Sequence, residues 1–313
     1  MHGVVELDFV KGHMGGNEIV LLDGNAMDNE RCVEAALSAL DSPGIRGDQA
    51  GILEKPTRGG DIKVKIVDRS ARDFIPMCGG LTQVLWKALA ETDVAKRYHI
   101  PKSLKQLVIE TDVGLVRVSL KTTRDGTAAF TDMTRFVEEC YRLGVSSIEV
   151  AGVKSVRVGR VLVADVCEIQ RAYPETDFDV MNSEAKEVLI KMQADFDGQR
   201  FLDTVNTDFA LFSMYLDDPT HGRVLFPHNV KGGHIEPSCG TGSVAIAVAL
   251  AETSRVGDGT VSVRLDSGGL LVLGGPETTE VLLVKREGKV TEAEFTHSLV
   301  EILCTGRIWF RVR

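Results

Sequence analysis

An internal repeat constrains the fold more than any other feature of the sequence. The segment PMCGGLTQVLWKALAET runs from Pro76 to Thr92, and PSCGTGSVAIAVALAET runs from Pro237 to Thr253. Aligned without a gap, the two segments share the opening Pro-x-Cys-Gly and the closing Ala-Leu-Ala-Glu-Thr. Alanine-rich helices alone produce chance matches, but the same opening in the same register makes chance a poor explanation. The repeat predicts two similarly folded halves, each with a Cys-Gly turn that leads into a central apolar helix.

Short β-branched runs bounded by Gly, Asp or Pro indicate that strands dominate the chain. Apolar residues at helical spacing predict fewer helices. Many strands with a few helices favour an α+β protein over alternating βαβ units. The predicted strands are residues 19–22, 62–67, 107–109, 115–120, 156–163, 261–265, 270–273 and 281–284, and the predicted helices are residues 29–40, 82–92, 131–143, 183–196, 242–253 and 291–303.

Composition narrows the class of protein. The 313 residues suffice for one large domain or two ordinary ones, and 43% hydrophobic and 26% charged residues are typical of a globular protein. A net charge of −9 argues against a nucleic-acid partner. The N-terminus does not resemble a signal peptide, and the longest apolar stretch, residues 244–251, is too short to span a bilayer. We therefore predict a cytoplasmic protein with no membrane partner.

The six cysteines show no CxxC spacing and no His-x3-His partner, so the sequence predicts neither a metal site nor a disulfide framework. A free cysteine in a reducing compartment is usually a small buried apolar side chain. Four of the six are interpreted in that way, among them Cys32 and Cys304.

Cys78 and Cys239 differ from the other four because each stands directly before a predicted helix. The first-turn N–H groups lack intrahelical partners, and the macrodipole adds positive charge there. Such a place lowers the pKa of a thiol and can hold a substrate carboxylate. Two facing turns would let one thiolate remove the proton next to the carboxylate while the other thiol returns a proton to the opposite face. Glycines leave the backbone open to a ligand at positions Gly79, Gly80, Gly240 and Gly242.

Further polar residues are candidates for substrate contacts. His13 lies in a Gly-rich turn with Asn17 close behind it, and Lys231, His234 and Glu236 form a polar run before the second cysteine. Loops near a site often carry substrate contacts, but the alternative for each residue is an ordinary solvated or turn-forming side chain.

The sequence resembles the superfamily of cofactor-independent diaminopimelate epimerases and proline racemases. The CGTG at 239–242 matches the second catalytic motif of that superfamily in full, and the MCG at 77–79 matches the opening of the first. Residues 9–24 resemble the first-strand signatures of both branches, residues 110–116 resemble a Thr-x-x-Gly-Leu-Val stretch, and residues 304–306 resemble a terminal Thr-Gly strand.

This resemblance implies two pseudo-symmetric domains, each a curved, mostly antiparallel, barrel-like sheet around a central helix, with the active site between them. The domains would be residues 1–130 joined by the strand 300–313, and residues 131–299. It also implies an isomerase, an amino-acid racemase or epimerase without pyridoxal phosphate or another cofactor, whose acid/base pair is Cys78 and Cys239. Asn17 becomes a substrate contact, and the carboxylate cradle becomes Gly79, Gly80, Gly240, Thr241, Gly242 and Ser243.

Three departures weaken any assignment of the substrate. The first motif reads Cys-Gly-Gly-Leu where the family has Cys-Gly-(Asn or His)-Gly, Val230 and Lys231 replace a Glu-Arg pair, and Ile235 replaces an Asp. Neither diaminopimelate nor proline is therefore supported. The open alternatives are an isomerase or dehydratase of an unsaturated or hydroxylated small carboxylic acid, and a non-catalytic small-anion binding protein. The expected partner is a small carboxylate or amino acid, and a homodimer is a further open alternative.

Overall fold

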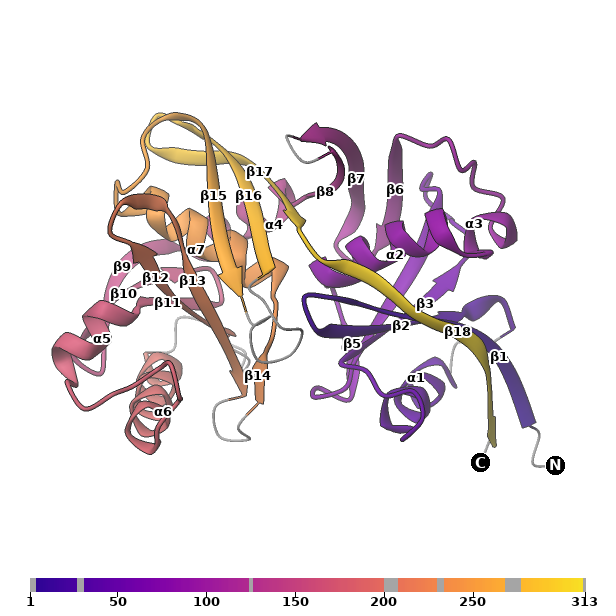
Figure 1. The fold of residues 1–313 in the computed structure, drawn as a ribbon, viewed down its shortest axis with the longest axis horizontal. Helices are drawn as coiled ribbons and strands as arrows, with labels where there is room; N and C mark the ends of the chain where they lie inside the picture. The colour runs from indigo at the N-terminus through magenta and orange to yellow at the C-terminus, as the bar shows by residue number, and fades with distance from the viewer. Residues whose placement is uncertain are drawn as a thin grey trace. The chain divides into compact units, whose positions relative to one another are not determined.

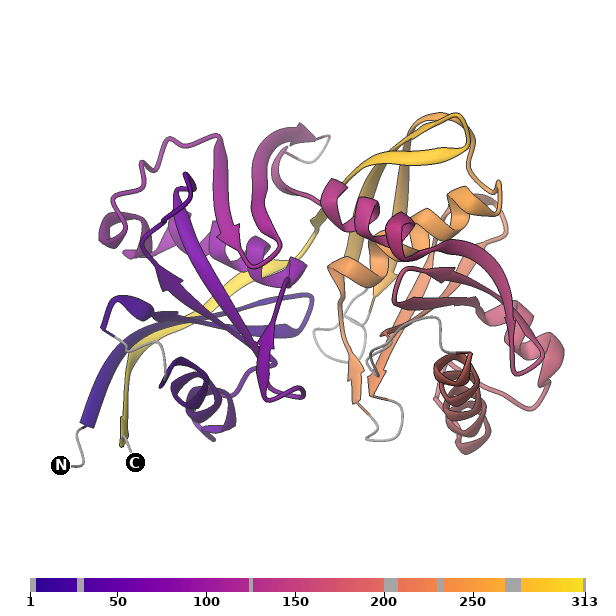
Figure 2. The ribbon, with the colours of Figure 1, turned by 180° about the vertical axis from the view of Figure 1, so that it is seen from behind.

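The computed structural model describes residues 4–26, 31–123, 126–199, 208–229, 234–267 and 277–311. The chain packs as two compact units: unit 1 comprises Met1–Asp132 and Thr296–Arg313, and unit 2 comprises Met133–Phe295. Both units combine sheet and helix (Figures 1 and 2), which confirms the predicted α+β class. Among the described residues, no helix is both long and apolar enough to cross a membrane.

Unit 1 is built around helix α2 (Gly79–Glu91). This helix contacts five strands of the unit, β1, β2, β7, β8 and β18, whose bounds are given below. Two further helices are α1 (Cys32–Asp41) and α3 (Val94–Arg97), and a 3-10 turn, η1, spans Gly24–Ala26. The strands are β1 (Val4–Met14), β2 (Asn17–Asp23), β3 (Gln49–Glu54), β4 (Ile62–Asp68), β5 (Asp73–Ile75), β6 (Gln106–Thr111), β7 (Gly114–Thr123), β8 (Gly126–Asp132) and β18 (Val300–Arg311).

Unit 2 is built around helix α7 (Gly240–Glu252). Helix α4 (Thr134–Leu143) packs along α7, as Figure 2 shows, while α5 (Val166–Ala172) and α6 (Ser183–Gly198) lie outside the sheet. The strands are β9 (Val145–Val150), β10 (Val153–Val158), β11 (Val161–Asp165), β12 (Asp208–Tyr215), β13 (Asp218–Asn229), β14 (His234–Glu236), β15 (Gly259–Ser267), β16 (Glu277–Arg286) and β17 (Lys289–His297), the last of which ends in unit 1.

The strand pairings of the two units follow the same order. In unit 1, β2 pairs with β3 in parallel, β3 with β4 and β4 with β5 antiparallel, β4 with β6 in parallel, and β6 with β7 antiparallel. In unit 2, β11 with β12, β12 with β13, β13 with β14, β13 with β15, and β15 with β16 repeat those five senses in turn. The pseudo-symmetry predicted from the sequence repeat is thus confirmed in the topology.

Helix α7 is the more buried of the two central helices because its sequence carries no charge before its last residue, Glu252. A helix that is apolar all round is stable only inside a core. Its C-terminal end is closed by Lys285 of β16, whose Nζ donates to the carbonyls of Ala251 and Val256, both at 2.9 Å. Lys285 therefore supplies a donor to one carbonyl of the last turn of α7 and to one carbonyl just beyond the helix.

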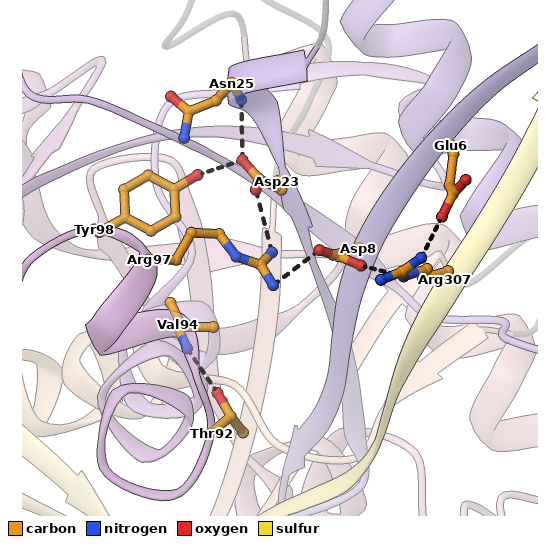
Figure 3. A network of polar contacts seen from close by, with 9 residues as sticks. All are labelled: Glu6, Asp8, Asp23, Asn25, Thr92, Val94, Arg97, Tyr98 and Arg307. Carbon is orange, nitrogen blue, oxygen red and sulfur yellow. Dashed lines mark hydrogen bonds and ion pairs between the residues drawn. The ribbon is translucent and has the colours of Figure 1, made fainter.

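A polar network fastens β1, β2 and β18 of unit 1 to α3 (Figure 3). Arg97 bridges Asp8 of β1, at 2.9 Å, and Asp23 of β2, at 3.1 Å. Tyr98 donates its hydroxyl to Asp23 at 2.9 Å, and Arg307 of β18 lies 3.2 Å from Asp8. Burial and the charge of Asp23 raise the pKa of the Tyr98 hydroxyl, so it stays a donor. The network ties together segments that are far apart in sequence.

A buried carboxylate holds the loop between β3 and β4. Glu110 of β6 is fully buried and accepts the N–H of Thr57 at 2.8 Å, the N–H of Gly60 at 2.9 Å, the Thr57 hydroxyl at 3.2 Å, and the N–H of Arg58. Burial acts to raise the pKa of Glu110, but these donors outweigh it and lower the pKa to about 2.

The helix predicted over residues 291–303 is wrong, because this segment forms β17 and the start of β18. Its apolar residues come close to helical spacing, yet Ala293 and Phe295 are two apart and face the core as in a strand. The strand predicted over 156–163 is a hairpin, since Gly159 adopts a positive φ of 61° and reverses the chain between β10 and β11. The strand predicted over 270–273 lies outside the described residues.

Cys32 and Cys304, both predicted to pack in the core, differ in burial. Cys32 is buried against the core beneath α1, as predicted. Cys304 is exposed, so the prediction that it belongs to the core is wrong. It lies in β18, and that strand has an outer face. A β-rich sequence pattern alone does not say which face of an outer strand is covered.

Candidate active site

The first Cys-Gly turn connects β5 to α2. Cys78 is the N-cap of the helix, with an extended backbone at φ −140° and ψ 116°. Its Sγ accepts the N–H of Leu81 at 3.4 Å, which satisfies one of the first-turn donors. The side chain is buried, with 8% of its surface exposed. A cysteine thus takes the place at which a serine or aspartate usually caps a helix.

The second Cys-Gly turn has the same geometry. Cys239 follows β14, caps α7 with φ −136° and ψ 114°, and its Sγ accepts the N–H of Gly242 at 3.4 Å. The two helices have the same length of 13 residues. The sequence repeat therefore corresponds to two cysteine-capped helices whose caps agree in backbone conformation, partner and distance.

Asn17 lies at the first turn. A Cβ placed on Gly80 would be 3.8 Å from Asn17 Nδ2 and 3.4 Å from Met14 Cε. Asn17 begins β2 directly after the β1–β2 turn and is almost fully buried. The fold thus brings a polar side chain to the glycine beside Cys78, where the sequence predicts a substrate contact.

His13 is placed differently. Its Nδ1 accepts the N–H of Gly16 at 3.2 Å, and its Nε2 lies 3.5 Å from the carboxylate of Glu301. Its neighbours in β1, Gly12 and Met14, face α2, so strand alternation puts His13 on the opposite side of the strand. The described contacts of His13 are therefore with its own turn and with β18 rather than with the Cys78 turn.

Gln49 is a contact of Cys78 that sequence reasoning missed. The Cys78 thiol donates to Gln49 Oε1 at 3.7 Å, and Gln49 Nε2 donates to Asp68 Oδ2 at 2.9 Å. All three side chains are buried. The contact joins residues 29 positions apart, so no local motif reveals it. The available signal is that Gln49 begins β3 and Asp68 ends β4, each next to an apolar run of its strand.

The half-buried Cys239 thiol instead has a carboxylate, that of Glu236, beside it. Its Sγ lies 3.2 Å from Thr241 Oγ1 and forms a hydrogen bond with the side chain of Glu236. Burial and then the charge of Glu236 raise the pKa of the Cys239 thiol well above its usual range, and the hydrogen bonds from Thr241 and Gly242 only partly oppose them. The sequence-based expectation that the helix N-terminus lowers the pKa is wrong for this thiol, because desolvation and a neighbouring carboxylate outweigh the helix.

The glycines of the second turn serve packing. A Cβ on Gly240 would lie 2.6 Å from the ring of Phe295, and one on Gly242 would lie 2.6 Å from the ring of Phe226. Ser243 is fully buried and its N–H donates to the carbonyl of Cys239 at 3.0 Å, so that N–H is already used within the helix. The absence of side chains at positions 240 and 242 is thus explained by two phenylalanine rings.

The remaining candidates precede Cys239. His234 begins β14 and pairs with Asn229, but its side chain lies outside the described part of the structure, as does all of Lys231. Within the residues that the structure describes, no group of three or more His, Cys, Asp or Glu side chains could hold a metal ion.

No protein-family model and no curated protein sequence matches the chain. Solved structures do. A phenazine biosynthesis protein of the PhzF family from Bacillus anthracis superimposes with a TM-score of 0.63 at 11% identity, over 98% of this chain and 99% of that one. A hydroxyproline epimerase from Agrobacterium vitis with bound trans-4-OH-L-proline gives 0.62 at 12%, over 97% and 91%. Methylitaconate-delta-isomerase gives 0.62 at 14%, over 98% and 96%.

These likenesses cover nearly all of this chain and nearly all of each relative, so they concern both units and not one of them. The protein has the diaminopimelate epimerase-like fold, as the sequence resemblance predicts.

Proposed function

We propose that this protein moves a proton at the carbon next to a carboxylate, and that it inverts the α-carbon of an amino acid without an organic cofactor. Cys78 and Cys239 are the proposed acid/base pair. One observation carries the proposal: both thiols cap a central helix with the same backbone conformation, and both accept the N–H three residues on at 3.4 Å. A cysteine used only for packing has no need of that arrangement twice.

The helix starts supply the rest of the chemistry. The proposed seat for a substrate carboxylate is made of first-turn N–H groups, those of Gly79 and Gly80 in one turn and of Gly240 and Thr241 in the other. The two macrodipoles stabilise the negative charge that develops on that carboxylate as the α-proton leaves. One cysteine takes the proton and the other delivers one to the opposite face, and the roles exchange when the reaction runs backwards.

Two kinds of substrate fit this chemistry. The hydroxyproline epimerase supports an amino acid, and methylitaconate-delta-isomerase supports an unsaturated carboxylic acid, and their TM-scores to this chain are equal at 0.62. An amino acid would be inverted at the α-carbon, whereas an unsaturated acid would have its double bond moved. The same proton abstraction starts both reactions, so the substrate decides between them.

Incorporation of solvent deuterium tests the proposal. The wild-type protein is incubated in deuterated buffer with L- and D-amino acids and with unsaturated and hydroxylated acids, and exchange at the α-carbon is followed by NMR. We expect exchange of one substrate class, lost in both Cys78→Ser and Cys239→Ser and kept in Cys304→Ser, the matched control at an exposed cysteine. Undiminished exchange in either active-site variant, or none with any acid by the folded and reduced protein, would overturn the proposal.

A further inference from the structure

Three buried polar side chains form a hydrogen-bond chain at the start of α2. Thr131 Oγ1 of β8 lies 2.7 Å from Gln83 Nε2 and 2.7 Å from Thr82 Oγ1, both of α2. Thr82 Oγ1 in turn lies 2.7 Å from the carbonyl oxygen of Gly79. Each of the three residues is at most 3% exposed, so these bonds form in a place where an unpaired polar group would be costly.

The direction of this chain follows from its last acceptor. A carbonyl oxygen can only accept, so Thr82 gives its single hydroxyl proton to Gly79. The Thr82 oxygen must then accept the proton of Thr131, and the Thr131 oxygen must accept from the NH2 group of Gln83. Every donor therefore points toward Gly79, and hydrogen bonds aligned in one sense strengthen one another.

The chain ends on the peptide group that joins Gly79 to Gly80. The C=O of Gly79 and the N–H of Gly80 lie in one plane and share the resonance of the peptide bond. A donor on the C=O therefore fixes the direction of the N–H and makes it a stronger donor. As a first-turn group, this N–H has no partner within α2, and it belongs to the proposed carboxylate seat.

The second turn begins its helix without such a chain. The residues that correspond to Thr82 and Gln83 in the repeat are Ser243 and Val244. Within the part of the chain that the structure describes, Ser243 Oγ is buried and has no hydrogen-bond partner. Helix α7 nevertheless starts with the same cap geometry as α2, so starting the helix does not require the chain.

We infer that Thr131 is a positioning residue of the first half-site. Through Thr82 it orients and polarises the Gly79–Gly80 peptide, so that the N–H of Gly80 binds the substrate carboxylate more strongly than an unsupported first-turn N–H would. The inference rests on the proposed function and deepens it, because it names the turn that holds the carboxylate more tightly. It also gives the polar residues Thr82, Gln83 and Thr131 a role that packing alone does not explain.

Nuclear magnetic resonance of the full chain labelled with 15N-glycine tests the inference without turnover. The Gly80 amide signal is identified by its disappearance in Gly80→Ala. Thr131→Val removes the hydroxyl but keeps the shape, so we expect it to move the Gly80 signal. We also expect it to weaken the binding of acetate, titrated at constant ionic strength, by about two- to fivefold.

Two variants and a control accompany this measurement. Thr131→Ser keeps a hydroxyl and is expected to keep the wild-type signal and acetate affinity. Thr82→Val cuts the chain one bond later and is expected to act like Thr131→Val. Thr279→Val is the matched control, because Thr279 of β16 is fully buried and its hydroxyl has no hydrogen-bond partner among the described residues.

The outcomes separate this inference from the proposed reaction. A Gly80 signal or an acetate affinity that is unchanged in both folded valine variants of the chain would overturn the inference, and so would equal changes in Thr279→Val. A shifted signal with weaker acetate binding, both restored in Thr131→Ser, would support it. Neither readout depends on turnover, so failure of the deuterium experiment would count against the proposed reaction alone.

Discussion

Replacing Glu110 with glutamine tests how strongly one buried carboxylate holds unit 1 together. In the wild-type protein, its two oxygens accept three backbone N–H groups and one hydroxyl of the β3–β4 loop. Glutamine keeps one oxygen and turns an NH2 group toward the remaining donors. At least one N–H of the loop then loses its partner and faces another donor in a buried position.

The expected loss of stability follows from the pKa shift of Glu110. A shift from 4.5 to about 2 corresponds to roughly 3 kcal/mol in favour of the ionised, folded state. The loop lies near the surface, where solvent screens part of this, so we expect Glu110→Gln to cost about 2 kcal/mol at neutral pH. Because the pKa is depressed in the folded state, this contribution is present above about pH 4.5 and is lost as the pH falls toward about 2.

Urea unfolding of the wild-type and Glu110→Gln proteins between pH 7 and pH 2 measures the difference. We expect a lower midpoint for the variant at pH 7 and a difference that shrinks steadily below about pH 4.5. Hydrogen exchange at the amides of Thr57 and Gly60 should accelerate in the variant at neutral pH. A stability difference of the same size at every pH would refute the electrostatic reasoning and leave only a packing effect.

Three further substitutions have expected outcomes. Gly240→Ala pushes a methyl group into the ring of Phe295, so we expect a loss of about 1–3 kcal/mol in urea unfolding, and wild-type stability would contradict the packing assigned to this glycine. Gly80→Ala meets Met14 only at 3.4 Å, so we expect near-normal stability with much slower deuterium exchange, and full exchange would exclude this glycine from the carboxylate seat. Lys285→Met removes a buried donor from the carbonyls of Ala251 and Val256, of which Ala251 keeps the N–H of Ser254, so we expect about 1–3 kcal/mol of destabilisation, and an unchanged urea midpoint would contradict this role of Lys285.

The sequence predicted the features that repeat or that have a strong local period. The two Cys-Gly turns and the helices that follow them were visible because Pro-x-Cys-Gly and Ala-Leu-Ala-Glu-Thr recur in register. The helices near residues 134–143 and 183–198 were visible from their apolar spacing. These are local properties of the chain, and local properties can be recognised without knowing the fold.

Contacts between distant segments could not be predicted in this way. The Cys78–Gln49–Asp68 chain joins β3, β4 and the first turn, and no spacing in the sequence announces it. The raised pKa of the Cys239 thiol depends on burial and on the direction of the Glu236 side chain, neither of which a motif records. The helix prediction for residues 291–303 failed because a local pattern was misleading. Apolar residues in two strands happened to fall at helical spacing.

The pairing of β1 with β18 has a consequence for how the protein folds as it is made. Unit 2 is continuous in sequence, whereas unit 1 needs residues 300–311 to cover β1. At about 5–20 residues per second, β1 leaves the ribosome roughly 15 to 60 s before β18 does. Unit 2 can therefore complete its sheet during synthesis while one side of β1 still waits for its neighbour. During that wait, β1 is an open strand edge that other chains can join, so the earliest part of unit 1 is the part most exposed to aggregation.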